Sequence, residues 1–232
     1  LRIRRFQNTA ALVGKICKRG VPECVSQLNT PVTAPCYNWV LMNTLGDMGV
    51  ATFSVLSFIY SFANAILSGV AQGLQPLWGQ AFGQKDRRSL QGIFASGLKI
   101  NIAAAVVIFV LLYVFRTPVV MLFNSEPALV EMASGALPVF AFSFLFMAVN
   151  LIFTAYFYST KQTIRADVIA VSRGIVVKAL AIFAVPAVFG ATYIWHSAAL
   201  AEGITVLLSL ICAMLSARGA AREVLSSAGK AQ

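Results

Sequence analysis

No charged side chain interrupts residues 48–84, MGVATFSVLSFIYSFANAILSGVAQGLQPLWGQAFGQ. A helix needs about 20 apolar residues to cross the ~30 Å hydrocarbon core of a bilayer, so this stretch is long enough for one membrane span with residues to spare. Pro76, Gly79 and Gly83 predict that the helix ends near residue 75. The stretch therefore predicts a transmembrane helix at about 50–75.

The composition of the whole chain agrees with a membrane protein. Of its 232 residues, 59% are hydrophobic and 11% are charged, whereas soluble domains carry about 25% charged residues. Further uncharged stretches predict six transmembrane helices within residues 20–217, a basic linker before them and a tail after them. The spans lie at about 20–44, 50–75, 91–115, 133–158, 167–190 and 193–216, the linker is 1–19 and the tail is 218–232. Because these segments are too long for barrel strands and lack a period of two, the predicted fold class is an all-α membrane protein.

The basic residues predict the orientation of the chain. They are concentrated in the linker, in loops 76–90 and 159–166, and in the tail, whereas the loops on the opposite side hold only Arg116. The opposite loops are 45–49, 116–132 and 191–192. Since basic residues accumulate on the cytoplasmic side of a membrane, we expect both termini of this chain in the cytoplasm and the spans in the inner (plasma) membrane. The net charge of +10 then reflects topology and requires no nucleic-acid partner.

The sequence lacks the residues of common catalytic and metal sites. Its four cysteines include no pair at the C-x-x-C spacing of metal and redox sites. His196 is the only histidine, and its place beside Trp195 at the outer end of the last span favours an interfacial aromatic belt over catalysis. The H-E-x-x-H and G-x-S-x-G motifs of hydrolases are absent. We therefore expect no enzyme activity, no metal and no cofactor.

Polar side chains form a narrow stripe along the second span. They recur at spacings of three and four residues and fall within an arc of about 80° at 100° per residue. The stripe consists of Ser54, Ser57, Ser61, Asn64, Ser68, Gln72 and Gln75. Such a stripe either packs against another helix or lines an aqueous substrate cavity, and the sequence leaves both interpretations open.

Two other spans offer polar or aromatic faces to a cavity. The first span contains three prolines, which favour a bent helix of the kind that lines transporter cavities, and it places Gln27 and Asn38 on one face. The fourth span is rich in aromatic rings, which suit bulky organic cations, and it includes Asn150 and Tyr156. The candidate cavity residues are Gln27, Asn38, Ser61, Asn64, Ser68, Gln72, Asn150 and Tyr156.

Ionisable residues within apolar spans are costly, so four of them are candidates for function. They are Glu23, Arg173, Lys178 and Glu202. The last two spans form a hairpin around residue 191, and at 1.5 Å per residue the depths of Lys178 and Glu202 differ by about 3 Å. Arg173 differs from Glu202 by about 10 Å on the same count. We therefore expect a Lys178–Glu202 pair, with Arg173–Glu202 as the alternative, serving either as a structural ion pair or as a coupling-ion site.

The stretch GVAQGLQPLWGQAFGQKDRRSL, residues 69–90, resembles the end of the eighth helix of the multidrug and toxic compound extrusion (MATE) transporters. Members of that family carry an A-Q-G-x-Q-P-x-x-G-x-x-x-G-like pattern followed by a basic loop. The matching residues are Gln72, Gly73, Gln75, Pro76, Gly79 and Gly83. Residues 41–59, 143–160 and 190–210 resemble further parts of the same half, with Asn150 in the tenth helix and Glu202 in the twelfth.

This resemblance implies the C-terminal six-helix lobe of a twelve-helix transporter whose two lobes enclose a central cavity. The chain would then be part of a longer protein, a secondary active antiporter that exports drugs or organic cations and is coupled to a proton or sodium gradient. Its implied partners are a small, cationic organic substrate, the N-terminal lobe of the same protein and the lipid bilayer.

The chain departs from one branch of the family. The acidic cation site of that branch corresponds here to Thr30 and to about Ala148, so the site is absent from this lobe. Glu23 instead resembles branches with a glutamate at the start of the seventh helix. The resemblance therefore leaves the choice between proton and sodium open.

Two other functions remain as alternatives. A lipid-linked oligosaccharide flippase of the same broader superfamily would line its cavity with several arginines to hold pyrophosphate, whereas the stripe of the second span is neutral. A non-transporting membrane subunit would need only packing, and it predicts that Asn64, Gln72 and Asn150 all face neighbouring helices.

Overall fold

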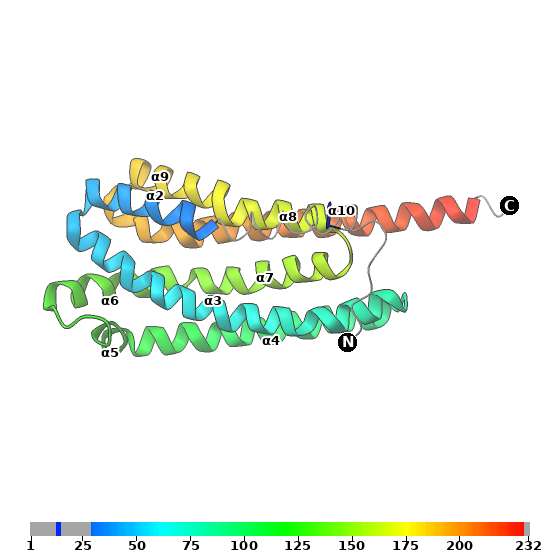
Figure 1. Ribbon diagram of the computed structural model, residues 1–232, viewed down its shortest axis with the longest axis horizontal. Coiled ribbons are helices and arrows are strands. Elements are labelled where there is room, and N and C mark those ends of the chain that lie inside the picture. Colours follow the sequence, from blue (N-terminus) through cyan, green and yellow to red (C-terminus); the bar gives the residue numbers. More distant parts are fainter. Residues whose placement is uncertain (1–12, 15–28, 230–232) are drawn as a thin grey trace.

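The computed structural model describes residues 13–14 and 29–229 of the chain, and side chains within residues 13–14 and 32–216. Within this part the chain is helical and forms no strand. The elements are α2 (Asn29–Thr44), α3 (Gly46–Gly83), α4 (Arg87–Val114), α5 (Arg116–Met121), α6 (Pro127–Ala141), α7 (Ser143–Ser159), α8 (Thr163–Val171), the π-helical turn η1 (Ser172–Val176), α9 (Val177–Phe189), the 3-10 helix η2 (Ala191–Trp195) and α10 (His196–Gly229). The long helices lie side by side along one axis, as a bundle (Figure 1).

Five helical segments in the described part are long and apolar enough to cross a membrane. They are Gly46–Gly83, Arg87–Val114, Pro127–Ser159, Thr163–Phe189 and Ala191–Ser216. Of the first predicted span, 20–44, the structure describes the part in α2. Large apolar side chains are exposed on the outside of the bundle, with Leu180 65% and Val188 71% exposed on α9, as expected of helices that face lipid.

The second predicted span is longer than expected, because Pro76 does not end its helix. Helix α3 continues to Gly83 with Pro76 inside it. A proline costs an interior helix one backbone hydrogen bond, but a helix in a bilayer must satisfy the other backbone groups internally and tolerates proline when it is packed. Beyond Pro76, Trp78 and Ala81 are buried in a cluster with side chains of α4 and α7, so packing holds the last turns of α3 in place.

Helices α3 and α4 are joined by a short, well-capped connection. Asp86 precedes α4, and its carboxylate accepts hydrogen bonds from the backbone N–H of Ser89 at 3.0 Å and from the Ser89 hydroxyl at 2.6 Å. These two hydrogen bonds hold the pKa of the Asp86 carboxyl below its ordinary value. The two helices approach closely at Gly97, where a Cβ would lie 2.4 Å from Leu74 Cδ1.

The fourth and fifth predicted spans are both interrupted. Helices α6 and α7 meet at Phe142 and together cover 127–159. In the fifth span, the π-helical turn η1 separates α8 from α9. Single π-helical turns of this kind store one extra residue within an α-helix and are frequent at functional sites, and Arg173 lies in this one.

Candidate substrate cavity

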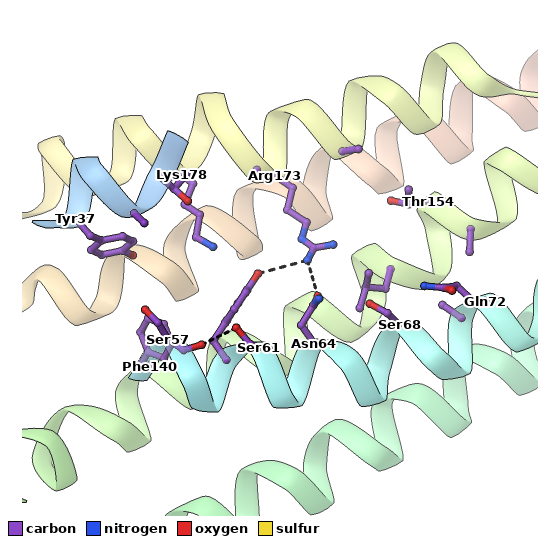
Figure 2. Close-up of a pocket in the computed structure, with 18 of the residues that line it drawn as sticks. Tyr37, Ser57, Ser61, Asn64, Ser68, Gln72, Phe140, Thr154, Arg173 and Lys178 are labelled. Atoms are coloured by element: carbon purple, nitrogen blue, oxygen red, sulfur yellow. Dashed lines mark hydrogen bonds between the residues drawn. The ribbon is translucent and has the colours of Figure 1, made fainter. Parts of the chain in front are cut away.

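A cavity of about 730 Å³ opens along one face of α3. Helix α3 forms one wall, and the opposite walls come from α2, α7 and the segment α8–η1–α9 (Figure 2). Its lining residues are Thr33, Ala34, Tyr37, Phe53, Ser57, Tyr60, Ser61, Asn64, Ser68, Ala71, Gln72, Gln75, Phe140, Leu151, Thr154, Ala155, Tyr158, Ala170, Arg173, Gly174 and Lys178. The cavity lies within the size range of drug-sized ligand sites, about 300–1,000 Å³.

The polar stripe of α3 faces this cavity. Of its seven members only Ser54 is missing from the lining. The opposite face of the same helix carries Ala63 and Leu67, which are buried in the core. Four predicted cavity residues therefore line the space, and among them Asn64 also contacts a neighbouring helical segment through Arg173. These four are Ser61, Asn64, Ser68 and Gln72.

Three other predicted cavity residues lie elsewhere. Asn38 is exposed and outside the lining. Tyr156 packs against Trp78 and Phe94, with ring centroids 5.9 and 5.0 Å apart. Asn150 is fully buried between α7 and α10. Gln27 and the ionisable Glu23 lie outside the described residues.

Asn150 does not line the cavity, because its side-chain amide forms hydrogen bonds with residues of α10. Its Nδ2 donates to the Glu202 side chain at 2.9 Å and to the Glu202 backbone carbonyl at 3.0 Å. Its Oδ1 accepts a hydrogen bond from the Ser209 hydroxyl at 3.0 Å. All of these groups are buried, so Asn150 joins two helices and holds one oxygen of Glu202.

Glu202 pairs with Arg173, so the expected Lys178–Glu202 pair is wrong and the alternative pair is confirmed. Arg173 Nε lies 3.0 Å from Glu202 Oε1. Depth along the helices does not choose between the two cations, because it takes no account of the direction and reach of their side chains. Two helical irregularities reduce the depth difference between Arg173 and Glu202 only in part, and the long arginine side chain spans the rest. The 3-10 helix η2 rises about 2.0 Å per residue instead of 1.5, which carries Glu202 about 2.5 Å further from the turn over its five residues. The π-helical turn η1 packs more residues into its length, which brings Arg173 closer to the same depth.

Arg173 also reaches α3 across the cavity. Its Nη2 lies 3.3 Å from Asn64 Oδ1 and 3.5 Å from the Tyr60 hydroxyl (Figure 2). The guanidinium thus links the buried carboxylate of α10 to the polar stripe of α3. The side chain of Arg173 is 16% exposed and that of Glu202 is 2% exposed, so the arginine is the partner that the cavity reaches.

Lys178 points into the cavity from α9 (Figure 2). Its ammonium lies 4.4 Å from the centroid of the Tyr60 ring, a cation–π contact. Glu202 does not line the cavity, so two cations and no carboxylate face the space among the described residues. The stripe of α3 is itself neutral, and the positive charge of the cavity comes from η1 and α9.

The sequence identified Arg173 and Lys178 as candidates for function, but α-helical periodicity did not predict that they share one face of the cavity. Five residues separate Arg173 from Lys178, and at 100° per residue they would point about 140° apart. The π-helical turn between them takes up one extra residue, so the two side chains share a face as residues four apart would in an α-helix. Glycine at position 174, next to a buried arginine in an apolar span, is the nearest sequence signal of such an irregularity.

The described residues form no cluster of three or more histidine, cysteine or acidic side chains that could bind a metal ion. Cys36 and Cys212 are free thiols. His196 is exposed at the start of α10, with its ring 5.3 Å from that of Tyr193. The described part of the cavity offers a ligand hydroxyls, amides, aromatic rings and two cations.

Comparisons with known proteins give one consistent result. The sequence matches the MatE family over residues 22–183. It is 25% identical over 208 residues to the multidrug export protein MepA of Staphylococcus haemolyticus, covering 90% of this chain and 45% of that protein. It is 27% identical over 211 residues to MepA of Staphylococcus saprophyticus, covering 89% and 45%. The chain therefore spans about half the length of these curated relatives.

Solved structures show the same fold. A multidrug resistance MATE family transporter in an outward-facing conformation matches with a TM-score of 0.84 at 16% identity, over 93% of this chain and 49% of that one. An inward-facing conformation of such a transporter matches with a TM-score of 0.80 at 16% identity, over 91% and 49%. The fold of this chain thus corresponds to about half of those structures in either conformation.

Proposed function

The chain belongs to the MatE family, and from this premise we propose that it forms the C-terminal lobe of a secondary active antiporter that exports drugs and other small organic compounds. Its relatives are named as multidrug export proteins, and it spans about half of their length. The remaining half would be an N-terminal lobe of the same protein. A proton gradient and a sodium gradient both remain candidates for the driving force.

The observation that carries this proposal is the cavity along α3. A subunit that needed only packing would have no use for a row of hydroxyls and amides that faces an open space of about 730 Å³. Such a row gives weak, exchangeable hydrogen bonds to diverse ligands, while Phe53 and Phe140 supply apolar surface in the same lining. The cavity would hold substrate between this lobe and the other one.

The transport cycle would be a rocking of the two lobes against each other. The similar match to outward-facing and inward-facing structures supports this, because a lobe that moves as a rigid body keeps its shape in both. The Arg173–Glu202 pair and the Asn150 contacts tie α7, η1 and α10 together, which favours movement as one unit. With basic loops facing inward, both termini of this chain would be cytoplasmic.

One observation favours a second candidate, a lipid-linked oligosaccharide flippase. Arg173 and Lys178 both line the cavity, and cations in this arrangement suit a pyrophosphate. The two functions differ in their cargo, so cells that need the flippase would be rescued by this protein only in the second case. We favour export of soluble drugs over lipid flipping, because the relatives of this chain are named as multidrug export proteins.

The test is efflux by the complete reading frame that contains this chain, expressed in bacteria that lack their own efflux pumps. We expect raised resistance to several drugs and energy-dependent dye efflux. Ser61→Trp should fill the cavity and lower efflux by about tenfold or more, because ligand volume is lost. Phe62→Trp, one residue away, exposed and outside the cavity lining, is the matched control and should leave efflux unchanged. Unchanged efflux in both variants would contradict a substrate site in this cavity.

A further inference from the structure

Among the described residues, those that line the cavity carry an excess of positive charge that drug export in general does not explain. Arg173 and Lys178 both line it, whereas Glu202, the partner of Arg173, is 1% exposed and lies behind the lining. One carboxylate thus balances one of two cations. Lysine is rarely buried without a partner, and an ionisable residue at membrane depth indicates a functional site.

Both cations keep hydrogen-bond donors for a ligand. The Nε of Arg173 is used by Glu202, and Nη2 is directed at Asn64 and Tyr60. The structure gives Nη1 no acceptor among the described residues. Lys178 contacts the Tyr60 ring, and no carboxylate of the described part lies within 4.0 Å of its ammonium. A guanidinium edge and an ammonium are therefore both free to donate into the cavity.

One aromatic ring of the lining that would suit an organic cation already has a cation over it. Lys178 lies over the face of Tyr60. A cationic ligand would have to displace that ammonium and would be repelled by Arg173 as well. Charge and geometry therefore oppose the cationic substrate that the sequence suggested.

We propose that this cavity selects organic molecules that carry an oxyanion, a carboxylate, sulfonate or phosphate, and binds that group between Lys178 and the guanidinium of Arg173. The inference rests on the proposed function and names its substrate class. The polar stripe of α3 and the ring of Phe140 would then receive the remainder of the molecule. Zwitterionic drugs belong to this class, and permanent cations without an acid group do not.

The test uses two fluorescent probes that differ only in the acid group, tetramethylrhodamine and its methyl ester. Binding to the purified complete protein is measured by fluorescence polarisation in detergent, where no membrane potential acts on the probes. We expect the free acid to bind at least about tenfold more tightly than the ester, the size of one charge-assisted hydrogen bond. Lys178→Met should reduce that preference to about threefold or less, and Lys178→Arg should keep it.

The matched control is Lys99→Met, which removes an exposed lysine of α4 outside the cavity and should leave the preference unchanged. Equal or tighter binding of the ester by the unchanged protein would overturn the inference. That result is expected if a carboxylate of the other lobe neutralises Lys178. An equal loss of affinity for both probes in Lys178→Met would also overturn the inference. Such a result would show that the substitution disturbs the shape of the cavity and that its charge does not select the acid.

Two further measurements separate this inference from the proposed function. Displacement of the acid probe by geranylgeranyl pyrophosphate would support the oxyanion site and identify a lipid as its source, whereas displacement only by soluble organic acids would identify a free substrate. Efflux of the ester but not of the acid by intact cells would leave drug export standing and overturn the inference. Efflux of neither probe, with no gain in drug resistance, would refute the proposed function itself.

Discussion

Replacing Glu202 by glutamine tests the network that holds α7, η1 and α10 together. Glu202 divides its two oxygens, with Oε1 on Arg173 and Oε2 on Asn150. Glutamine has one side-chain oxygen, so one of these two donors must lose its acceptor. The charge of Arg173 also loses its counterion in a site where Glu202 is 1% exposed.

The size of the effect follows from burial. Breaking a fully buried ion pair costs about 3–5 kcal/mol. The side chain of Arg173 is 16% exposed and reaches the cavity, so water recovers part of the loss, and we expect about 2–3 kcal/mol. The complete protein is about twice as long as this chain if it resembles its relatives, and the shift per kcal/mol falls with length, so we expect a fall of about 2–6 °C in its midpoint of thermal unfolding.

The assay is thermal unfolding of the complete detergent-purified protein, followed by fluorescence-detected size-exclusion chromatography. Glu131→Gln, an exposed glutamate of α6, is the matched control and should shift the midpoint by no more than about 1 °C. Arg173→Met combined with Glu202→Gln should be less destabilising than the sum of the single changes, since the two residues are directly coupled. A Glu202→Gln protein with unchanged midpoint and unchanged yield would refute the reasoning, and so would strict additivity.

Three further predictions concern the packing of α3 and α4. Gly97→Val should destabilise the protein by about 1–3 kcal/mol because the new side chain would overlap Leu74. Gly92→Ala, with open space around it, should be neutral or stabilising. The thermal unfolding midpoints of the two variants test this difference, and equal midpoints would contradict it. Trp78→Ala should cost about 3–5 kcal/mol because the ring is fully buried, and a loss below about 1 kcal/mol in the same assay would show that the end of α3 is not held by packing. Asp86→Ala should increase amide hydrogen exchange in the first turn of α4, because the helix loses its N-terminal cap. Asp86→Asn should leave the exchange rate unchanged. Equal exchange rates in the two variants would argue against the cap.

The features that the sequence predicted are those that depend on α-helical periodicity and on the distribution of charge. The absence of charge located the spans, because a bilayer excludes charged side chains regardless of detailed packing. The stripe of α3 faced the cavity because α3 is regular there, so that Ser61, Asn64 and Ser68 point the same way as 100° per residue requires.

The rest of the site depended on departures from ideal helices. A π-helical turn places Lys178 beside Arg173, and a 3-10 helix shifts Glu202 toward Arg173. Neither has a strong local sequence signature, since both are set by how whole helices fit together. Asn150 was a reasonable cavity candidate by its polarity, but its partner lies on a helix 52 residues away in sequence, and pairing at that distance is decided by packing.

The continuity of α3 has a mechanical consequence. At 1.5 Å per residue its 38 residues span about 57 Å, almost twice the ~30 Å of the hydrocarbon core. The helix that carries the polar wall of the cavity also continues through Pro76 to the short connection at Lys85, after which Arg87 and Arg88 begin α4. A tilt of about 10° imposed at one end of a rod of this length moves the other end by about 10 Å. A force at the membrane surface that tilts α3 would therefore also move the wall of the cavity.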